Sequence, residues 1–294
     1  MKLYIIGNGF DVAHDIDCKY CHFGDFLADN YPDYYESIMS GYCRSNALWK
    51  VFENELPSCA IHIEEFCLQM GNEMRDELDY DPMDDMGIGR WLDDQYKFLK
   101  ELPKYLRLWV ESIDTKKDAV YNINKDSIFL TFNYTDTLEY VYGIDSDNIK
   151  HIHGYVKNKK EELIIGHGNQ KIISYALEKK KEAETNFVDF SVSTFDRVSK
   201  YCEVTLKRTS RIIDENTDFF ESLSDVDEVI IIGHSLNTVD MPYFKKVFNS
   251  ISDNVIWKAY YFEDKDEKPF EKVLSDLGIR KENRFVLKTQ ELYL

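Results

Sequence analysis

The sequence has no long run of apolar residues and no excess of positive charge. Its longest apolar runs are a few residues, whereas a membrane-spanning helix needs about 20. The opening run is also too short for a secretory signal, so we expect a cytoplasmic protein without a membrane partner. Asp and Glu outnumber Lys and Arg by 54 to 36, which gives a formal net charge of −18. That charge repels phosphate backbones and anionic lipids, which argues against nonspecific nucleic-acid binding.

The sequence also lacks an obvious cysteine framework. The six cysteines are Cys18, Cys21, Cys43, Cys59, Cys67 and Cys202. Cys18 and Cys21 have the spacing of a metal or redox pair, but no second Cys/His pair follows at zinc-finger spacing. A zinc site would need His14 and His22 as further ligands. Reduced thiols are the favoured interpretation, and we predict no metal.

A chain of 294 residues with 44% hydrophobic residues can bury one large core or two.

The start of the chain is predicted to form a strand followed by a tight turn. Leu3–Ile6 is an apolar run of the kind found inside parallel sheets, and it stops at Gly7. Gly7-Asn8-Gly9 permits a tight turn, because glycine tolerates positive φ. A helix that starts near Asp11 would direct its N–H groups at an anion, so we predict a nucleotide-phosphate cradle here.

Apolar runs alternate with helical patterns along the rest of the chain. Further strand-like runs cover residues 127–133, 149–153, 162–166, 228–233, 255–262 and 285–288. Helices are predicted over 172–183 and 198–223. This alternation predicts an α/β fold, with a Rossmann-like, doubly wound and mostly parallel sheet.

A large helical insertion interrupts this pattern. Residues 34–120 read as helical nearly throughout, and they include a long amphipathic helix over 91–110 with a kink at Pro103. The acidic stretch at 76–85 lacks the alternating ligand spacing of a calcium loop, so we interpret it as a solvated loop. We find no internal repeat, and we predict one domain over residues 1–294 with a helical insertion at about 32–125.

Polar clusters follow several of the predicted strands, where open α/β sheets bind ligands. They are Gly7-Asn8-Gly9-Phe10-Asp11, Thr131-Phe132-Asn133-Tyr134-Thr135, His151-Ile152-His153-Gly154, Gly166-His167-Gly168 and Gly233-His234-Ser235-Leu236. Several histidines at one edge of a sheet favour a functional role for at least one. Alternate strand residues point to opposite faces, so His151 and His153 cannot both face a ligand. We expect His153, next to Gly154, to face it.

Each cluster also permits a purely structural interpretation. Gly7 and Gly9 lack the third glycine of a dinucleotide fingerprint, since Val12 stands in its place. Asn133 could instead cap a helix over the following residues.

Two enzyme classes, the serine hydrolases and the metallophosphoesterases, match these clusters only in part. Gly233–Asn237 resembles a serine-hydrolase nucleophile elbow, but it lacks the final glycine, and no histidine follows His234. A metallophosphoesterase would use Asp11, Asn133, His153 and His167. The Asp-x-His opening of such sites is missing.

Taken together, the motifs resemble those of the AbiH family, which is associated with abortive infection, a bacterial defence against phage. The motifs are Ile5–Asp11, Phe132–Thr135, His151–Gly154 and Ile232–Leu236, followed by Asp240 and Tyr243-Phe244. They occur in order from residue 5 to residue 244 and cover most of the chain.

The same order is similar to the wider sirtuin-like NAD-binding group, in which several defence proteins hydrolyse NAD. By this resemblance Asn133 would position the nicotinamide ribose or a water, and His153 would act as the base. Residues implied in holding the nucleotide are Gly7, Asn8, Gly9, Phe10, Asp11, Thr135, Gly154, His167, Gly233, His234, Ser235 and Asp240. The four-cysteine zinc module of sirtuins is absent, which argues against deacylation. Thr135 also replaces the acidic residue usual after the Asn-Tyr pair in NAD-cleaving relatives.

The resemblance therefore implies an AbiH-like phage-defence protein that binds NAD or a related nucleotide and hydrolyses NAD at the nicotinamide–ribose bond. An Asn and a His near the reacting carbon suit this oxocarbenium-like chemistry. The alternative is a non-catalytic defence module that senses a nucleotide or binds a partner. That partner would be a second copy of the chain or a phage component.

Overall fold

The computed structural model describes residues 1–41, 48–50, 52–58, 64–65, 68–69, 90, 93–94, 96–186 and 188–294. The chain divides into two compact units. The first comprises Met1–Lys19, Arg107–Ile164 and Arg208–Leu294, and the second comprises Tyr20–Leu106 and Ile165–Lys207. The predicted acidic loop at 76–85 lies outside the described residues.

The first unit is built on a six-stranded sheet in which every pairing is parallel. The strands are β1 (Lys2–Ile6), β2 (Ile128–Thr131), β3 (Ile149–His151), β4 (Glu228–Ile232), β5 (Ile256–Tyr261) and β6 (Arg284–Lys288). Their order across the sheet is β3-β2-β1-β4-β5-β6, which is the doubly wound order of a Rossmann fold. The predicted fold class is therefore confirmed.

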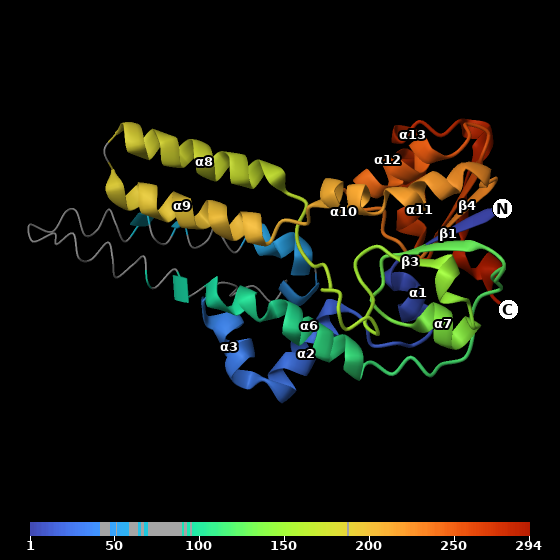
Figure 1. The fold of residues 1–294 in the computed structure, drawn as a ribbon, viewed down its shortest axis with the longest axis horizontal. Helices are drawn as coiled ribbons and strands as arrows, with labels where there is room; N and C mark the ends of the chain where they lie inside the picture. Colours follow the sequence, from blue (N-terminus) through green and yellow to red (C-terminus); the bar gives the residue numbers. More distant parts are fainter. Residues whose placement is uncertain are drawn as a thin grey trace, which may run out of the picture. The chain divides into compact units, whose positions relative to one another are not determined.

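Helices cover both faces of this sheet, as Figure 1 shows. Leu3 and Ile5 pack into the core under α10 (Thr209–Glu215), α11 (Thr217–Glu221), α12 (Met241–Ser250) and α13 (Glu267–Asp276). Tyr4 and Ile6 pack into a second core with α1 (Asn8–Ala13) and α7 (Thr137–Tyr142). Adjacent β1 residues thus enter opposite cores, which is why the strand reads as continuously apolar.

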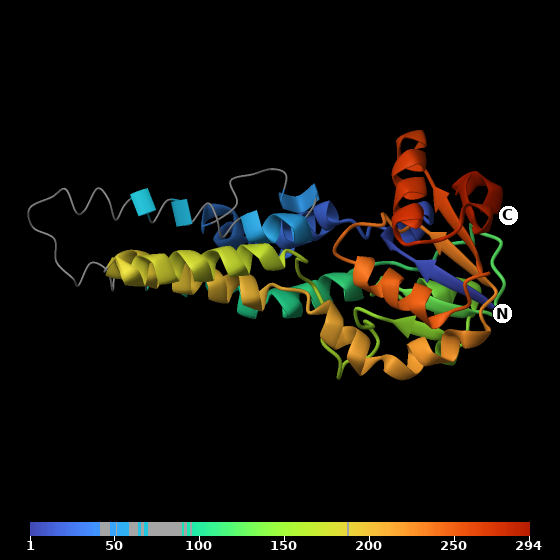
Figure 2. The same ribbon diagram turned by 90° about the horizontal axis from the view of Figure 1, so that it is seen from above.

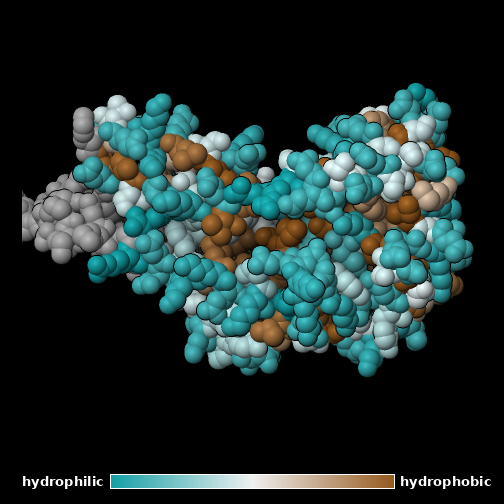
Figure 3. Space-filling model, viewed as in Figure 1, coloured by the Kyte–Doolittle hydropathy of each residue, from teal (hydrophilic) through white to brown (hydrophobic). Residues whose placement is uncertain are grey.

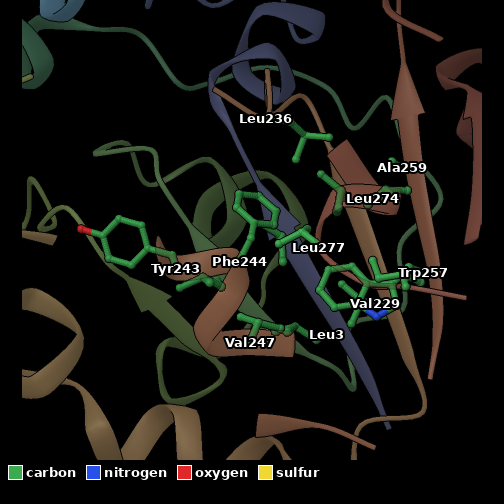
Figure 4. Close-up of a cluster of buried hydrophobic side chains, with 14 of the residues drawn as sticks. Leu3, Val229, Leu236, Tyr243, Phe244, Val247, Trp257, Ala259, Leu274 and Leu277 are labelled. Atoms are coloured by element: carbon green, nitrogen blue, oxygen red, sulfur yellow. The ribbon is translucent and has the colours of Figure 1, made fainter. Parts of the chain in front are cut away.

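The first of these cores is close-packed around large side chains. Trp257 of β5 and Phe244 of α12 are fully buried against Leu3 and Val229 (Figure 4). The hydroxyl of Tyr243 points away from the cluster. Short 3-10 turns complete this unit: η3 (Ser146–Asn148), η4 (Ser222–Asp225), η5 (Asp264–Asp266), η6 (Lys281–Asn283) and η7 (Thr289–Leu292).

The second unit contains two long helices that lie side by side, α8 (Gln170–Thr185) and α9 (Asp189–Val204) (Figures 1 and 2). It also contains α2 (Tyr20–Asn30), α3 (Pro32–Gly41), η1 (Leu48–Lys50) and η2 (Tyr96–Lys100). The division between the units falls within α6 (Leu102–Ser112). The predicted helix at 172–183 is confirmed as α8.

The strand predicted over 162–166 is wrong, because these residues have no regular structure. Their main-chain groups bond to neighbouring loops instead of to a strand. The N–H of Ile164 donates to the carbonyl of His153 at 2.8 Å, and its carbonyl accepts from the Tyr134 hydroxyl at 2.7 Å. The third strand also ends early, at His151 instead of at His153.

Three helix predictions need correction. The helix predicted over 198–223 is divided among α9, α10 and α11, because residues 205–207 leave the helix and bond to the main chain of His167. The predicted helical run to residue 120 ends at Ser112. Pro103 lies in the first turn of α6, where its missing N–H costs nothing, so it does not kink a longer helix.

Two observations concern membrane-spanning helices and the character of the surface. Among the residues that the structure describes, no helix is both long and apolar enough to cross a membrane. Hydrophilic residues cover most of the face viewed in Figure 3.

Candidate functional site

The strand order reverses between β1 and β4, and the loops that follow these two strands touch. The N–H of Gly7 donates to the carbonyl of Ile232 at 3.0 Å, and the N–H of Gly9 donates to the carbonyl of Gly233 at 2.8 Å. In doubly wound sheets this switch point is where ligands bind. Here the Gly9 amide, one of those predicted to hold phosphate, already has a partner within the protein.

Close approach, and not positive φ, explains the first two glycines. The φ of Gly7 is −118°. A Cβ on Gly7 would lie 2.6 Å from the His234 Cα, and one on Gly9 would lie 2.9 Å from the Gly233 Cα. Gly233 itself has φ +68°, and a Cβ there would lie 2.1 Å from the Phe10 nitrogen. The helix after the turn begins at Asn8 instead of near Asp11, and Asn8 and Gly9 are exposed.

Asp11 lies at the centre of a buried polar group formed by α1 and the loop after β2. One carboxylate oxygen accepts from the Thr135 hydroxyl, which in turn accepts from the Thr137 hydroxyl at 3.3 Å. The other oxygen makes no hydrogen bond with the described residues. Burial, with 1% of the residue exposed, raises the Asp11 pKa to about 6, although the two threonines and Asn133 oppose the shift.

Asn133 is held beside this group. Its side-chain Nδ2 donates to the carbonyl of Gly7 at 3.2 Å, and its N–H donates to the Thr131 hydroxyl at 3.1 Å. Its carbonyl accepts from Nδ1 of His151 at 3.0 Å. Asn133 does not cap the next helix, since the N-cap of α7 is Asp136.

His153 and His234 form a second polar group on either side of Asp240. The Nε2 atom of His153 is 3.8 Å from one Asp240 oxygen, and that of His234 is 3.5 Å from the other. The Nδ1 atom of His234 accepts the N–H of Leu236 at 2.9 Å, so in the neutral ring Nε2, the nitrogen nearer Asp240, carries the proton. Asp240 is the N-cap residue of α12, but its side chain makes no capping bond.

Phe132 separates the two polar groups. Its ring packs edge-on against His153 at 5.1 Å and against His234 at 4.5 Å between centroids, within the core under α12. The side chain of the next residue, Asn133, instead bonds to Gly7. The two residues predicted to share one reaction centre, Asn133 and His153, therefore belong to neighbouring groups at the same edge of the sheet.

Gly154 and His167 have local structural roles, and Ser235 lies at the surface. Gly154 has φ +92°, and a Cβ there would lie 2.8 Å from the Glu162 carbonyl oxygen. Ser235 is exposed. His167 belongs to the second unit, where it is buried, accepts the N–H of Asn169 at 3.0 Å and bonds to the carbonyl of Cys202 at 3.0 Å. It does not follow a strand, so the argument that placed it at the sheet edge fails.

Two of the four ligands that a zinc site would need, His14 and Cys18, have other contacts. His14 bonds through Nδ1 to the carbonyl of Phe10 and through Nε2 to the Tyr142 hydroxyl, each at 2.7 Å. The buried thiol of Cys18 contacts the Asn8 carbonyl at 3.8 Å. Within the described part of the chain, no three His, Cys, Asp or Glu side chains are grouped to hold a metal ion.

Sequence reasoning missed four contributors to this edge: Phe132, Thr137, Glu139 and Tyr155. Three of them lie within four residues of a predicted motif residue, and Phe132 lies inside a motif. Thr137 joins α7 to the loop after β2, and Glu139 joins α7 to β3. These contacts could not be predicted from the sequence, because they depend on how α7 packs against the sheet.

The strand order, with polar groups where β1, β2, β3 and β4 end, defines a Rossmann-like α/β protein. Residues 3–261 match the family described as bacteriophage abortive infection AbiH. This match spans most of the chain, which therefore belongs to the AbiH family and is a phage abortive-infection protein. No curated protein matches it.

Proposed function

We propose that this AbiH protein binds NAD or a related nucleotide at the carboxyl edge of its sheet and hydrolyses the nicotinamide–ribose bond. One observation carries the proposal: Asn133 and the His153–Asp240 pair lie on the loops that surround the switch point between β1 and β4. The resemblance to sirtuin-like NAD-binding proteins supports the choice of nucleotide. Asn8 and Gly9 are exposed at the same edge, although the Gly9 N–H donates to the Gly233 carbonyl.

The chemistry requires an attacking water and a base. Water adds to C1′ of the ribose while the bond to nicotinamide breaks, and nicotinamide leaves with the electron pair. The proton lost by the water passes to the His153 imidazole. The Asp240 oxygen 3.8 Å from Nε2 stabilises the resulting imidazolium. Asn133 would exchange its bond to the Gly7 carbonyl for one to the water or to a ribose hydroxyl.

The test is release of nicotinamide from NAD by the purified full chain. We expect turnover by the natural protein and a loss of about 100-fold or more in kcat for Asn133→Ala and for His153→Ala. His14→Gln is the matched control, because His14 is also a buried histidine of the first unit but its partners are Phe10 and Tyr142. Thermal unfolding of each variant separates lost chemistry from lost folding. Equal losses in His153→Ala and His14→Gln would contradict the proposal.

A second candidate is a nucleotide sensor without turnover, and burial of the reacting groups favours it. Asn133 is 8% exposed and His153 is 3% exposed, and the Gly9 amide is bonded to Gly233. In a sensor, the bound nucleotide only has to shift these buried and bonded groups. It does not have to react with them. Saturable NAD binding by calorimetry without nicotinamide release would establish the sensor and exclude the hydrolase.

A further inference from the structure

His151, which the proposed reaction does not use, is held from both sides by hydrogen bonds. Its Nδ1 lies 3.0 Å from the Asn133 carbonyl oxygen, and its Nε2 lies 2.9 Å from Oε1 of Glu139 on α7. Its ring stacks on Tyr155 with centroids 4.2 Å apart. The side chain is only 8% exposed, so these contacts define its surroundings.

The partners determine which ring nitrogen carries a proton. A carbonyl oxygen can only accept, so Nδ1 must donate its N–H to Asn133. A second proton then lies between Nε2 and Glu139, because an imidazole nitrogen without hydrogen and an ionised carboxylate are both acceptors. Whether that proton resides on the ring or on the carboxyl group, the Nδ1–H remains directed at Asn133.

We propose that His151 is a positioning residue, which fixes the main chain of Asn133 so that its side-chain amide is presented at the switch point. This inference rests on the proposed function of Asn133. The Asn133 main chain is bonded on one side to the Thr131 hydroxyl and on the other to His151. The side-chain amide of Asn133 donates a hydrogen bond to the Gly7 carbonyl, and a ligand can replace this bond without moving the backbone.

The charged and titratable groups around His151 come from three elements. Glu139 lies on α7 and Asp136 is the N-cap residue of that helix, while Asp11 lies on α1 and Tyr155 follows β3. Burial, reinforced by Glu139 and Asp136, raises the pKa of Tyr155. The His151 ring lies close enough to Asp11 to oppose the rise in the Asp11 pKa.

Two substitutions separate the bond to Asn133 from the other contacts of the ring. The amide nitrogen of an asparagine can occupy the position of Nδ1, whereas that of a glutamine occupies the position of Nε2. His151→Asn therefore keeps the donor to Asn133, and His151→Gln keeps only the donor to Glu139. Both lose the stacking on Tyr155, so a purely structural role would affect them alike.

The first measurement needs no activity. In protein labelled with ¹⁵N in histidine and asparagine, we expect the His151 Nδ1 to be protonated at pH 7. We also expect the Asn133 side-chain amide resonances to keep their positions in His151→Asn and to shift in His151→Gln. A proton on Nε2 alone, or equal shifts in the two variants, would overturn the proposal.

The second measurement uses nicotinamide release. We expect kcat in His151→Gln to fall at least ~10-fold below that in His151→Asn, with KM changed less than about 3-fold, because a small displacement of a reacting group lowers the rate without weakening binding. Glu139→Gln, whose amide can donate to Nε2, should retain the Asn133 resonances. If the resonances behave as expected but no variant and no natural protein releases nicotinamide, the proposed hydrolysis fails while the positioning role stands.

Discussion

At the scale of single residues, Asp11 shows how burial sets a chemical property. Its carboxyl group is enclosed by α1 and the loop after β2, and it receives one short hydroxyl contact from Thr135. Removal from water favours the uncharged acid more than the neighbouring hydroxyl groups favour the anion, so its pKa rises. Ionisation of Asp11 therefore opposes folding.

This predicts a pH dependence that Asp11→Asn should remove. The pKa rises from its ordinary 3.8 to about 6, so the folded chain binds more protons than the unfolded chain between these values. Stability falls as pH increases through that window. The free energy of unfolding of Asp11→Asn minus that of the natural protein should increase by ~1.4 kcal/mol as the pH rises from 5.0 to 7.5. Urea unfolding at both pH values measures the gain.

The control for this prediction is Asp15→Asn, two residues after α1. Asp15 is exposed and has φ +55°, a conformation that asparagine adopts readily. Its difference from the natural protein should stay constant over the same pH range. A constant difference for Asp11→Asn as well would show that Asp11 ionises normally in the folded chain.

At the scale of strands and helices, the parallel sheet was readable from the sequence. Each observed strand except β3 has at least four residues, and the four central ones are almost wholly buried, so an unbroken apolar run identifies them. Ile164 and Ile165 gave the same local signal without forming a strand. A run of apolar residues shows only that a segment is buried, whereas a strand also needs a neighbour to bond with.

The roles of the glycines at the switch point were not readable from the sequence. Gly7 and Gly233 are 226 residues apart, and a side chain at either would collide with the loop of the other. Local sequence can suggest positive φ, but it contains no information about a distant loop that passes within van der Waals distance. The separation of Asn133 and His153 by Phe132 was hidden for the same reason.

The contact between these loops predicts a large effect for Gly233→Ala. We expect a loss of more than about 3 kcal/mol, because the strain of positive φ, roughly 1–2 kcal/mol, adds to a collision with the Phe10 main chain. Gly143→Ala, at φ +65° with nothing within 4 Å of its Cβ, should cost only the strain. Denaturant unfolding of both variants tests this. Similar losses would mean that the two loops can separate.

At the scale of the whole molecule, charge is the dominant feature. The formal net charge is −18 at pH 7 and the pI is about 4.8. Many of the lysines and arginines are already paired on the surface, as in Lys2–Glu228 and Arg284–Glu271, which leaves an excess of carboxylates that repel one another. Such repulsion destabilises a compact chain, and salt weakens it.

This repulsion predicts that NaCl stabilises the folded chain at neutral pH. Between 10 mM and 300 mM NaCl at pH 7.5 we expect the first thermal transition to rise by about 2–5 °C, which corresponds to roughly 1 kcal/mol for a chain of this size. At pH 5, close to the pI, the net charge is small and the same change in salt should have little effect. Scanning calorimetry at the two pH values measures both responses. An equal rise at both would mean that the salt acts through burial of apolar surface, because a general salting-out effect does not depend on net charge.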